Sequence, residues 1–100
     1  MQKPNCRGYS IAGKTVLVVE DDHKTASLIS LYLGNEGARV VCATDGQTGL
    51  ELAQRLNPNL IILDRMLPGL DGPSVCEEIR KTLDIPIIFL SARGEEDCLL

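Results

Sequence analysis

Short apolar runs alternate with polar, helix-like stretches along most of the chain. Four of these runs are aliphatic and rich in Val, Ile and Leu, and they cover 14–19, 38–43, 60–63 and 85–90. Runs of this kind predict strands that are buried on both faces, as in a parallel sheet. Residues 1–12 combine Pro, Gly, Asn and charged residues without periodicity. We therefore expect an N-terminal tail at 1–12 and one domain over 13–100.

The stretches between these runs have helical periodicity, and another begins after the last run; they cover 22–37, 45–56, 72–83 and 94–100. In the stretch 22–37, apolar residues lie at the spacing of one helix face, at Ala26, Ile29 and Leu33. Asp22 is suited to cap its first turn. Strand and helix thus alternate four times with short linkers. This alternation predicts an α/β fold, a parallel sheet of right-handed βαβ units with helices on both faces.

Composition narrows the class of protein only slightly. The 100 residues suffice for one domain, and 44% hydrophobic residues with only three aromatics predict an aliphatic core. The net charge of −4 argues weakly against nucleic acid as a direct partner of this segment. No run approaches the roughly 20 apolar residues that span a bilayer. We see no secretory signal before the first strand, so we expect no membrane association and a cytoplasmic location.

The cysteines give no sign of metal or disulfide chemistry. Cys6, Cys42, Cys76 and Cys98 lie at wide, irregular spacings that fit neither a zinc site nor a disulfide framework. We expect Cys42 and Cys76 to be buried as small hydrophobic side chains.

Carboxylates follow two of the apolar runs. Glu20, Asp21 and Asp22 come after the first run, Asp64 comes after the third, and Ser91 follows the fourth. In open α/β sheets, functional residues gather at the carboxyl ends of the strands. The first and third strands are wholly apolar, so we expect them to be central and adjacent, with their carboxylates close together. Such charges repel unless a cation offsets them, and oxygen ligands without His or Cys point to Mg²⁺.

Structural roles compete with this interpretation. Helix capping explains Asp22, and capping together with the helix dipole could explain all three acids after the first strand. Asp64 alone could form an Asx turn before the loop at 66–69, and Ser91 alone is more often a turn or cap residue. Arg65, beside Asp64, could pair with a kinase or with neighbouring acids, but we expect it to be solvated. The two acidic positions together, at the ends of two strands, favour a functional site.

Three segments resemble the receiver domain of bacterial two-component response regulators: VLVVEDD, LIILDRMLPGLDG and IPIIFLSARGEED. They occur in the order and at the spacing of that family, and the resemblance extends from about Lys14 to the last residue. Within that family, the sequence is most similar to the OmpR/PhoB-like subfamily, in which the receiver is joined to a winged-helix DNA-binding domain. The resemblance implies a flavodoxin-like, doubly wound sheet with strand order 2-1-3-4(-5), and the fifth strand–helix unit has no counterpart in this sequence.

The resemblance also implies roles for single residues. Asp64 would be the phosphoacceptor for a phosphoryl group from a sensor histidine kinase. Asp21 would bind Mg²⁺ directly, Glu20 largely through water, and the Met66 carbonyl would be a further ligand beside Asp64. The Ser91 hydroxyl would turn toward the phosphoryl oxygens as a switch. Such a domain is not a conventional enzyme, since at most it catalyses its own phosphorylation and dephosphorylation.

Part of the family pattern has no match in this sequence. The resemblance implies a lysine before a proline, but no lysine follows Lys81. We therefore expect a C-terminally truncated receiver that ends early in its fourth helix. The strand at 85–90 would then be a bare apolar edge, which favours a homodimer or a segment-swapped assembly. DNA binding would require an output domain outside this sequence. The alternative is a pseudo-receiver, a docking module of the same fold without productive phosphorylation.

Overall fold

The structure is a computed structural model that describes residues 10–90, so Ser91 and the helix expected at 94–100 lie outside the described residues. The elements in chain order are β1 (Thr15–Val19), α1 (His23–Asn35), β2 (Arg39–Ala43), α2 (Gly46–Leu56), β3 (Leu60–Asp64), α3 (Gly72–Arg80) and β4 (Ile87–Leu90). All strand pairs are parallel, and the strands lie in the order β2-β1-β3-β4. This is the order that the family resemblance implied.

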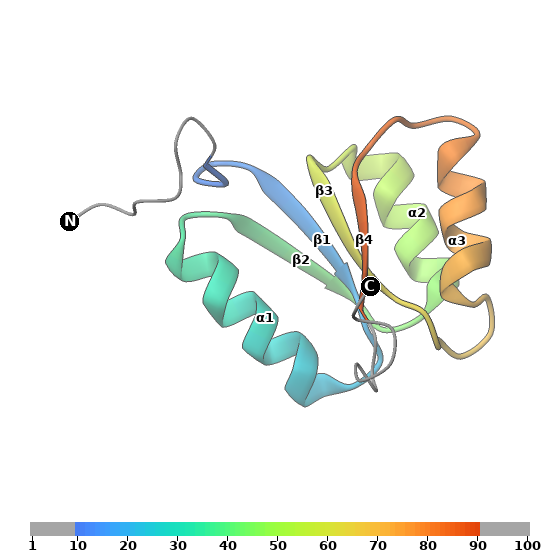
Figure 1. The fold of residues 1–100 in the computed structure, drawn as a ribbon, viewed down its shortest axis with the longest axis horizontal. Helices are drawn as coiled ribbons and strands as arrows, with labels where there is room; N and C mark the ends of the chain where they lie inside the picture. The colour runs from blue at the N-terminus through green and yellow to red at the C-terminus, as the bar shows by residue number, and fades with distance from the viewer. Residues whose placement is uncertain (1–9, 91–100) are drawn as a thin grey trace, which may run out of the picture.

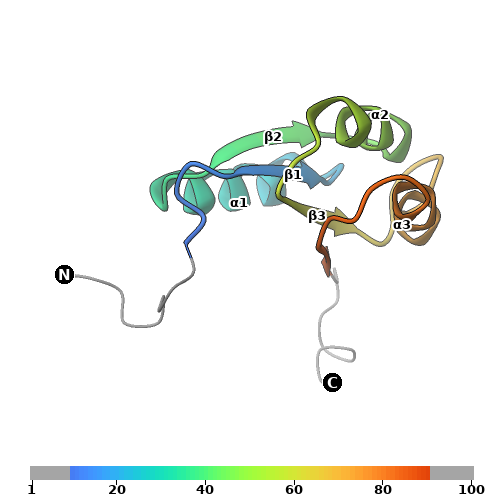
Figure 2. The same cartoon turned by 90° about the horizontal axis from the view of Figure 1, so that it is seen from above.

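The helices lie on both faces of this sheet (Figure 1 and Figure 2). Helix α1 covers one face beside β1 and β2, while α2 and α3 lie side by side on the other face. The predicted α/β fold with a doubly wound parallel sheet is therefore confirmed. Within the described residues, no helix has the length and apolar character needed to cross a bilayer.

The central strand β1 is buried on both faces, as its uninterrupted apolar run predicted. Successive side chains of a strand point to opposite faces. Leu17 and Val19 belong to the core cluster under α2 and α3, whereas Val16 and Val18 belong to the smaller cluster under α1. All four are fully buried. On the α1 side, Ile29 packs against this smaller cluster, in agreement with the predicted helix face.

Each helix within residues 10–90 begins directly after an aspartate. The aspartate carboxylate accepts a hydrogen bond of 2.8–3.0 Å from the backbone N–H three residues further on, in the pairs Asp22–Thr25, Asp45–Thr48 and Asp71–Ser74. Such N-caps satisfy a backbone donor that the first helical turn leaves without an intrahelical partner. The capping role expected of Asp22 is therefore confirmed.

Three local predictions were wrong. Helix α3 ends at Arg80, earlier than predicted, because backbone hydrogen bonds close a tight turn there. Strand β4 begins at Ile87, because the preceding Pro86 has no N–H to donate to the ladder. Cys42 is exposed rather than buried, because β2 forms an edge of the described sheet; its thiol lies 3.2 Å from the Ser30 hydroxyl.

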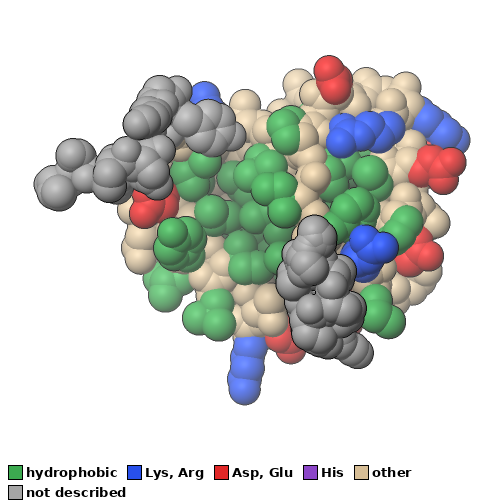
Figure 3. Space-filling view, in the orientation of Figure 1, with side chains coloured by type: hydrophobic (Ala, Val, Ile, Leu, Met, Phe, Trp, Pro, Cys, Tyr) green, Lys and Arg blue, Asp and Glu red, His purple; other side chains and the backbone are tan. Residues whose placement is uncertain are grey.

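One face of the sheet is only partly covered by the described residues. Apolar side chains gather in the middle of this face, beside α1 (Figure 3). Strand β4 forms one edge of the described sheet, and Ile88 is 52% exposed. Of the isoleucine and phenylalanine side chains expected to form a bare apolar edge at 85–90, only Ile88 is exposed: Ile87 and Phe89 are partly buried, and Ile85 is buried in the core.

Candidate functional site

Two acidic positions meet at the carboxyl edge of the sheet. Strands β1 and β3 pair in parallel with Val19 opposite Leu63. Glu20 follows β1 directly and Asp64 is the last residue of β3, so both lie at the same edge. Asp21 comes next, in the turn before α1. The predicted adjacency of these two strands is confirmed.

The three carboxylates form a compact cluster. One oxygen from each of Glu20, Asp21 and Asp64 lies within 4.8 Å of the other two. Glu20 and Asp64 are each only 6% exposed, whereas Asp21 is exposed to solvent. Within residues 10–90, no lysine, arginine or histidine forms an ion pair with any of the three. The cluster therefore carries negative charge that no described side chain pairs with.

Backbone N–H groups orient the two buried carboxylates. The Asp22 N–H donates to Oε2 of Glu20 at 3.0 Å, and the Met66 N–H donates to Oδ1 of Asp64 at 3.2 Å. In both cases the donor lies two residues after the carboxylate, so the local turn itself holds the side chain. The Asx-type contact considered for Asp64 as a structural alternative is thus present, and it occurs together with the acidic cluster.

The surroundings of Glu20 raise the pKa of its carboxyl above the ordinary value of 4.5. Burial is the largest cause of this shift; the Asp22 hydrogen bond opposes it, and the nearby Asp64 and Asp21 carboxylates add to it. In contrast, hydrogen bonds from Thr25 lower the pKa of the exposed Asp22. Ionisation of Glu20 is therefore unfavourable beside the other two carboxylates, and a proton or a nearby cation would relieve it.

The donor set fits a hard divalent cation. Mg²⁺ binds carboxylate oxygens and commonly uses one or two of them together with water. The cluster of Glu20, Asp21 and Asp64 contains neither a histidine nor a thiol, which are the ligands typical of zinc and other softer metals. The residues present are therefore suited to Mg²⁺.

The loop from β3 to α3 follows a defined path beside Asp64. The Gly72 N–H donates to the Arg65 carbonyl at 3.1 Å, and a Cβ on Gly72 would stand 2.7 Å from Arg65 Cα. Leu67 is buried in the core. Gly69 has a φ of +75°, a conformation that glycine adopts without steric cost. Both ends of the loop are thus held close to the acidic cluster.

One contact at this edge was not expected from the sequence. The Arg65 guanidinium lies over the Phe89 ring, with 5.3 Å between Cζ and the ring centroid. Phe89 stands opposite Leu63 in the β3–β4 ladder. The contact therefore joins the residue after Asp64 to the neighbouring strand. Its position depends on the pairing of two strands, and no local signal in the sequence indicated it.

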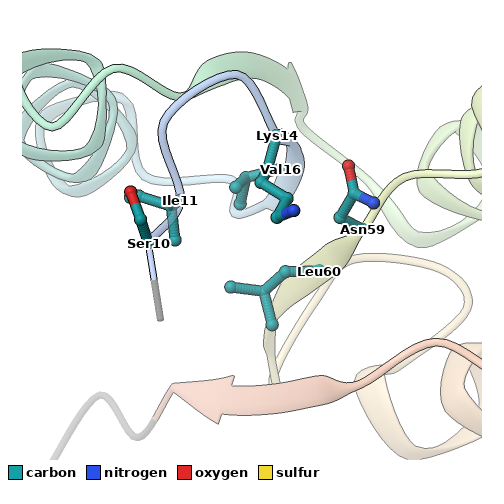
Figure 4. Close-up of a pocket in the computed structure, with 6 residues that line it drawn as sticks. All are labelled: Ser10, Ile11, Lys14, Val16, Asn59 and Leu60. Carbon is teal, nitrogen blue, oxygen red and sulfur yellow. The ribbon is translucent and has the colours of Figure 1, made fainter. Parts of the chain in front are cut away.

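Two hollows are lined by residues outside the cluster. One, of about 440 Å³, is lined by residues of the first turns of α1, namely His23, Lys24, Ser27 and Leu28. Another, of about 200 Å³, is lined by Ser10, Ile11, Lys14, Val16, Asn59 and Leu60 (Figure 4). The second hollow lies where β1 and β3 begin, at the opposite edge of the sheet from the carboxylates.

The response regulator receiver domain family matches residues 16–100, so the chain belongs to that family. The recognition based on the three sequence segments is thus confirmed. Among characterised relatives, the chain is 44% identical over 82 residues to the transcriptional regulatory protein AfsQ1 of Streptomyces coelicolor. That match covers 82% of the chain and 36% of the relative. The chain therefore spans about a third of the length of this relative.

Solved receiver domains share the fold. The BeF3-activated N-terminal receiver domain of Klebsiella pneumoniae RstA has a TM-score of 0.74 and 38% identity, over 77% of this chain and 66% of that one. The receiver domain of the Francisella response regulator 1452 has a TM-score of 0.78 and 35% identity, over 85% and 71% of the two chains. The flavodoxin-like fold expected from the resemblance is therefore confirmed for the described strands.

Proposed function

We propose that Asp64 accepts a phosphoryl group from the phosphohistidine of a sensor histidine kinase. A carboxylate oxygen of Asp64 forms the new P–O bond while the P–N bond of the donor breaks. The imidazole leaves with the electron pair and takes up a proton. The observation that supports this most is the position of Asp64, at the end of a central strand and within 4.8 Å of Glu20 and Asp21 oxygens.

Glu20, Asp21 and Asp64 would hold Mg²⁺ together with the backbone carbonyl of Met66, with Glu20 acting largely through water. When bound, Mg²⁺ offsets the negative charge of the carboxylates and of an incoming phosphoryl group. The chain's own backbone N–H groups orient Glu20 and Asp64. Ser91, the proposed switch hydroxyl, lies outside the described residues.

The proposed biological role is control of transcription. Residues 13–100 would be the receiver and 1–12 a tail, and an output domain of the winged-helix, OmpR/PhoB-like type would bind DNA. The relative AfsQ1, a transcriptional regulatory protein, supports this by analogy. The domain would act in the cytoplasm as a signalling unit and not as a conventional enzyme.

Two protein partners are proposed. A histidine kinase must reach Asp64. The hollow on the first turns of α1 is lined by His23, which directly follows the acidic residues 20–22 in the sequence. This hollow is therefore the surface on which we expect the kinase to rest. The second partner is another copy of the chain. The exposed Ile88 on the edge strand β4 favours a homodimer or a segment-swapped assembly.

Phosphorylation by a small acyl phosphate tests the role of Asp64. The longest form of the protein that contains residues 1–100 is incubated with acetyl phosphate and Mg²⁺ and examined by intact mass. We expect one added phosphate, which is lost in Asp64→Asn and on chelation of Mg²⁺. Asp84→Asn is the matched control, since Asp84 is exposed and precedes β4 at the opposite edge of the sheet.

Two outcomes would contradict the proposal. Labelling that survives Asp64→Asn would assign the phosphoryl group to another residue. A folded wild-type protein that takes up no phosphate would favour the alternative function, a pseudo-receiver that docks without phosphorylation. Circular dichroism establishes in each case that the protein is folded.

A further inference from the structure

Arg65 is a cation placed directly beside the proposed phosphoacceptor. It follows Asp64 in the chain, so the two Cα atoms are about 3.8 Å apart. Its backbone is held by the hydrogen bond from the Gly72 N–H, which leaves little freedom at the start of the loop. The backbone of this residue is therefore held by the end of the loop that follows Asp64.

The side chain of Arg65 is held as well. Its guanidinium carbon lies 5.3 Å from the centroid of the Phe89 ring. A guanidinium stacked on an aromatic ring is restricted in position, while the N–H groups at its edge remain able to donate. Because Phe89 stands opposite Leu63, the ring belongs to the strand next to the acceptor strand. The charge is thus held over the strand next to the acceptor strand.

The Arg65 charge is not used in an ion pair within the described residues. No carboxylate of residues 10–90 forms a salt bridge with its guanidinium. The nearby cluster has three carboxylates with oxygens within 4.8 Å of one another. A bound divalent cation would still leave one net negative charge, and a phosphodonor is itself an anion. An unpaired cation on the residue next to Asp64 would reduce this repulsion.

We propose that Arg65 is a specificity-determining residue that attracts dianionic phosphodonors to Asp64. This inference rests on the proposed function of Asp64. The same positive charge acts in the opposite direction on the metal, because it repels a divalent cation in the cluster. Arg65 therefore speeds transfer from an anionic donor and weakens the binding of Mg²⁺. Replacing a residue with a purely structural role would not lower the phosphorylation rate and at the same time raise the affinity for Mg²⁺.

The first test measures the second-order rate constant for phosphorylation by acetyl phosphate in the longest form of the protein. At low ionic strength, Arg65→Gln should lower this rate constant about three- to tenfold. At about 0.5 M salt, where charges are screened over a few ångströms, the difference should nearly vanish. Arg65→Lys, which keeps the charge, should retain most of the rate. The matched control is Arg55→Gln, which removes the same charge from the last turn of α2.

The second test measures Mg²⁺ binding by calorimetry without any phosphodonor. Arg65→Gln should bind Mg²⁺ about two- to fivefold more tightly than the wild-type protein, and Arg55→Gln should match the wild type. Phe89→Leu keeps the charge but removes the ring, so its rate constant should lie between those of wild type and Arg65→Gln. A loss of both Mg²⁺ affinity and rate in Arg65→Gln, or equal behaviour of the two arginine variants, would overturn the inference.

The same series separates this inference from the proposed function. If Asp64→Asn is still phosphorylated, the proposed function fails and the inference fails with it. If Asp64→Asn blocks labelling but Arg65→Gln behaves like the wild type at low salt, only the role of Arg65 is wrong.

Discussion

Gly49 of α2 packs directly against Val19 of β1, so that a Cβ on Gly49 would lie 2.8 Å from both methyl carbons of Val19. Val19 is fully buried and immediately precedes Glu20. Its branched side chain is stiff and has no room to move aside. The close approach of α2 therefore helps to position the end of β1 and, with it, the first carboxylate of the cluster.

Gly49→Ala should destabilise the protein. The added methyl group would overpack the interface with Val19, and overpacking of this kind costs about 1–3 kcal/mol in the free energy of unfolding. Gly34→Ala is the control, since a Cβ on this helical glycine would meet nothing within 4 Å. That variant should be neutral or up to about 1 kcal/mol more stable. Urea unfolding followed by circular dichroism measures both, and equal stabilities would contradict the packing argument.

Glu20→Gln should stabilise the folded protein at neutral pH when Mg²⁺ is absent. Because the folded-state pKa of Glu20 is raised above 4.5, the folded protein holds this proton more tightly than the unfolded chain does. Stability is therefore lost as the pH rises from 4.5 toward the raised pKa. Glutamine cannot ionise and avoids this loss. Unfolding free energies measured across this pH range should show a flatter profile in the variant.

Mg²⁺ should reverse this order of stability, so that the wild-type protein becomes more stable than Glu20→Gln. A cation that binds only the folded state adds about 2.7 kcal/mol to the stability when its concentration is 100 times its dissociation constant. The wild-type protein should gain this stabilisation, and Glu20→Gln should gain less. Glu77→Gln is the control, because Glu77 is exposed on α3 and belongs to no acidic cluster. Equal gains in Glu20→Gln and wild type would exclude Glu20 from the metal site.

Asp45, the N-cap of α2, should make the stability of the protein depend on pH in the opposite direction to Glu20. Hydrogen bonds from Thr48 lower the pKa of Asp45 below 3.8, so its charged form favours the folded state. This contribution is present above pH 3.8 and is lost as the pH falls through the lowered pKa. Asp45→Asn keeps an acceptor for the helix but does not titrate. Its stability relative to wild type should improve on acidification, and thermal unfolding as a function of pH measures this change.

Ile88→Lys should reduce self-association of this chain. Ile88 is 52% exposed on the edge strand β4, and a lysine on an exposed edge discourages pairing with another strand. Leu56→Lys is the control, because Leu56 is 41% exposed at the end of α2, away from the sheet edge. Sedimentation velocity should show oligomers for the wild-type chain and for Leu56→Lys, and fewer for Ile88→Lys. A stable wild-type monomer would show that the edge does not drive association.

The strands and helices were predictable because their signals are local. A strand buried on both faces needs an unbroken apolar run, which residues 16–19 and 60–63 both show directly before Glu20 and Asp64. Aspartates before helical stretches were equally direct indicators of N-caps. Exact ends were less predictable, since Arg80 ends α3 through a turn stabilised by its neighbours. The exposure of Cys42 depended on β2 being at an edge, which the composition of the run does not reveal.

By itself, the sequence determined the candidate chemistry: carboxylates such as Glu20 and Asp64 stand at the ends of apolar runs, and parallel strands bring such ends to one edge. Only the tertiary structure decided that the carboxylate oxygens lie within 4.8 Å of one another and that the Arg65 guanidinium stacks on the Phe89 ring. The reason is physical. Contacts between strands depend on their order and register, and a shift of one residue would turn every side chain to the other face.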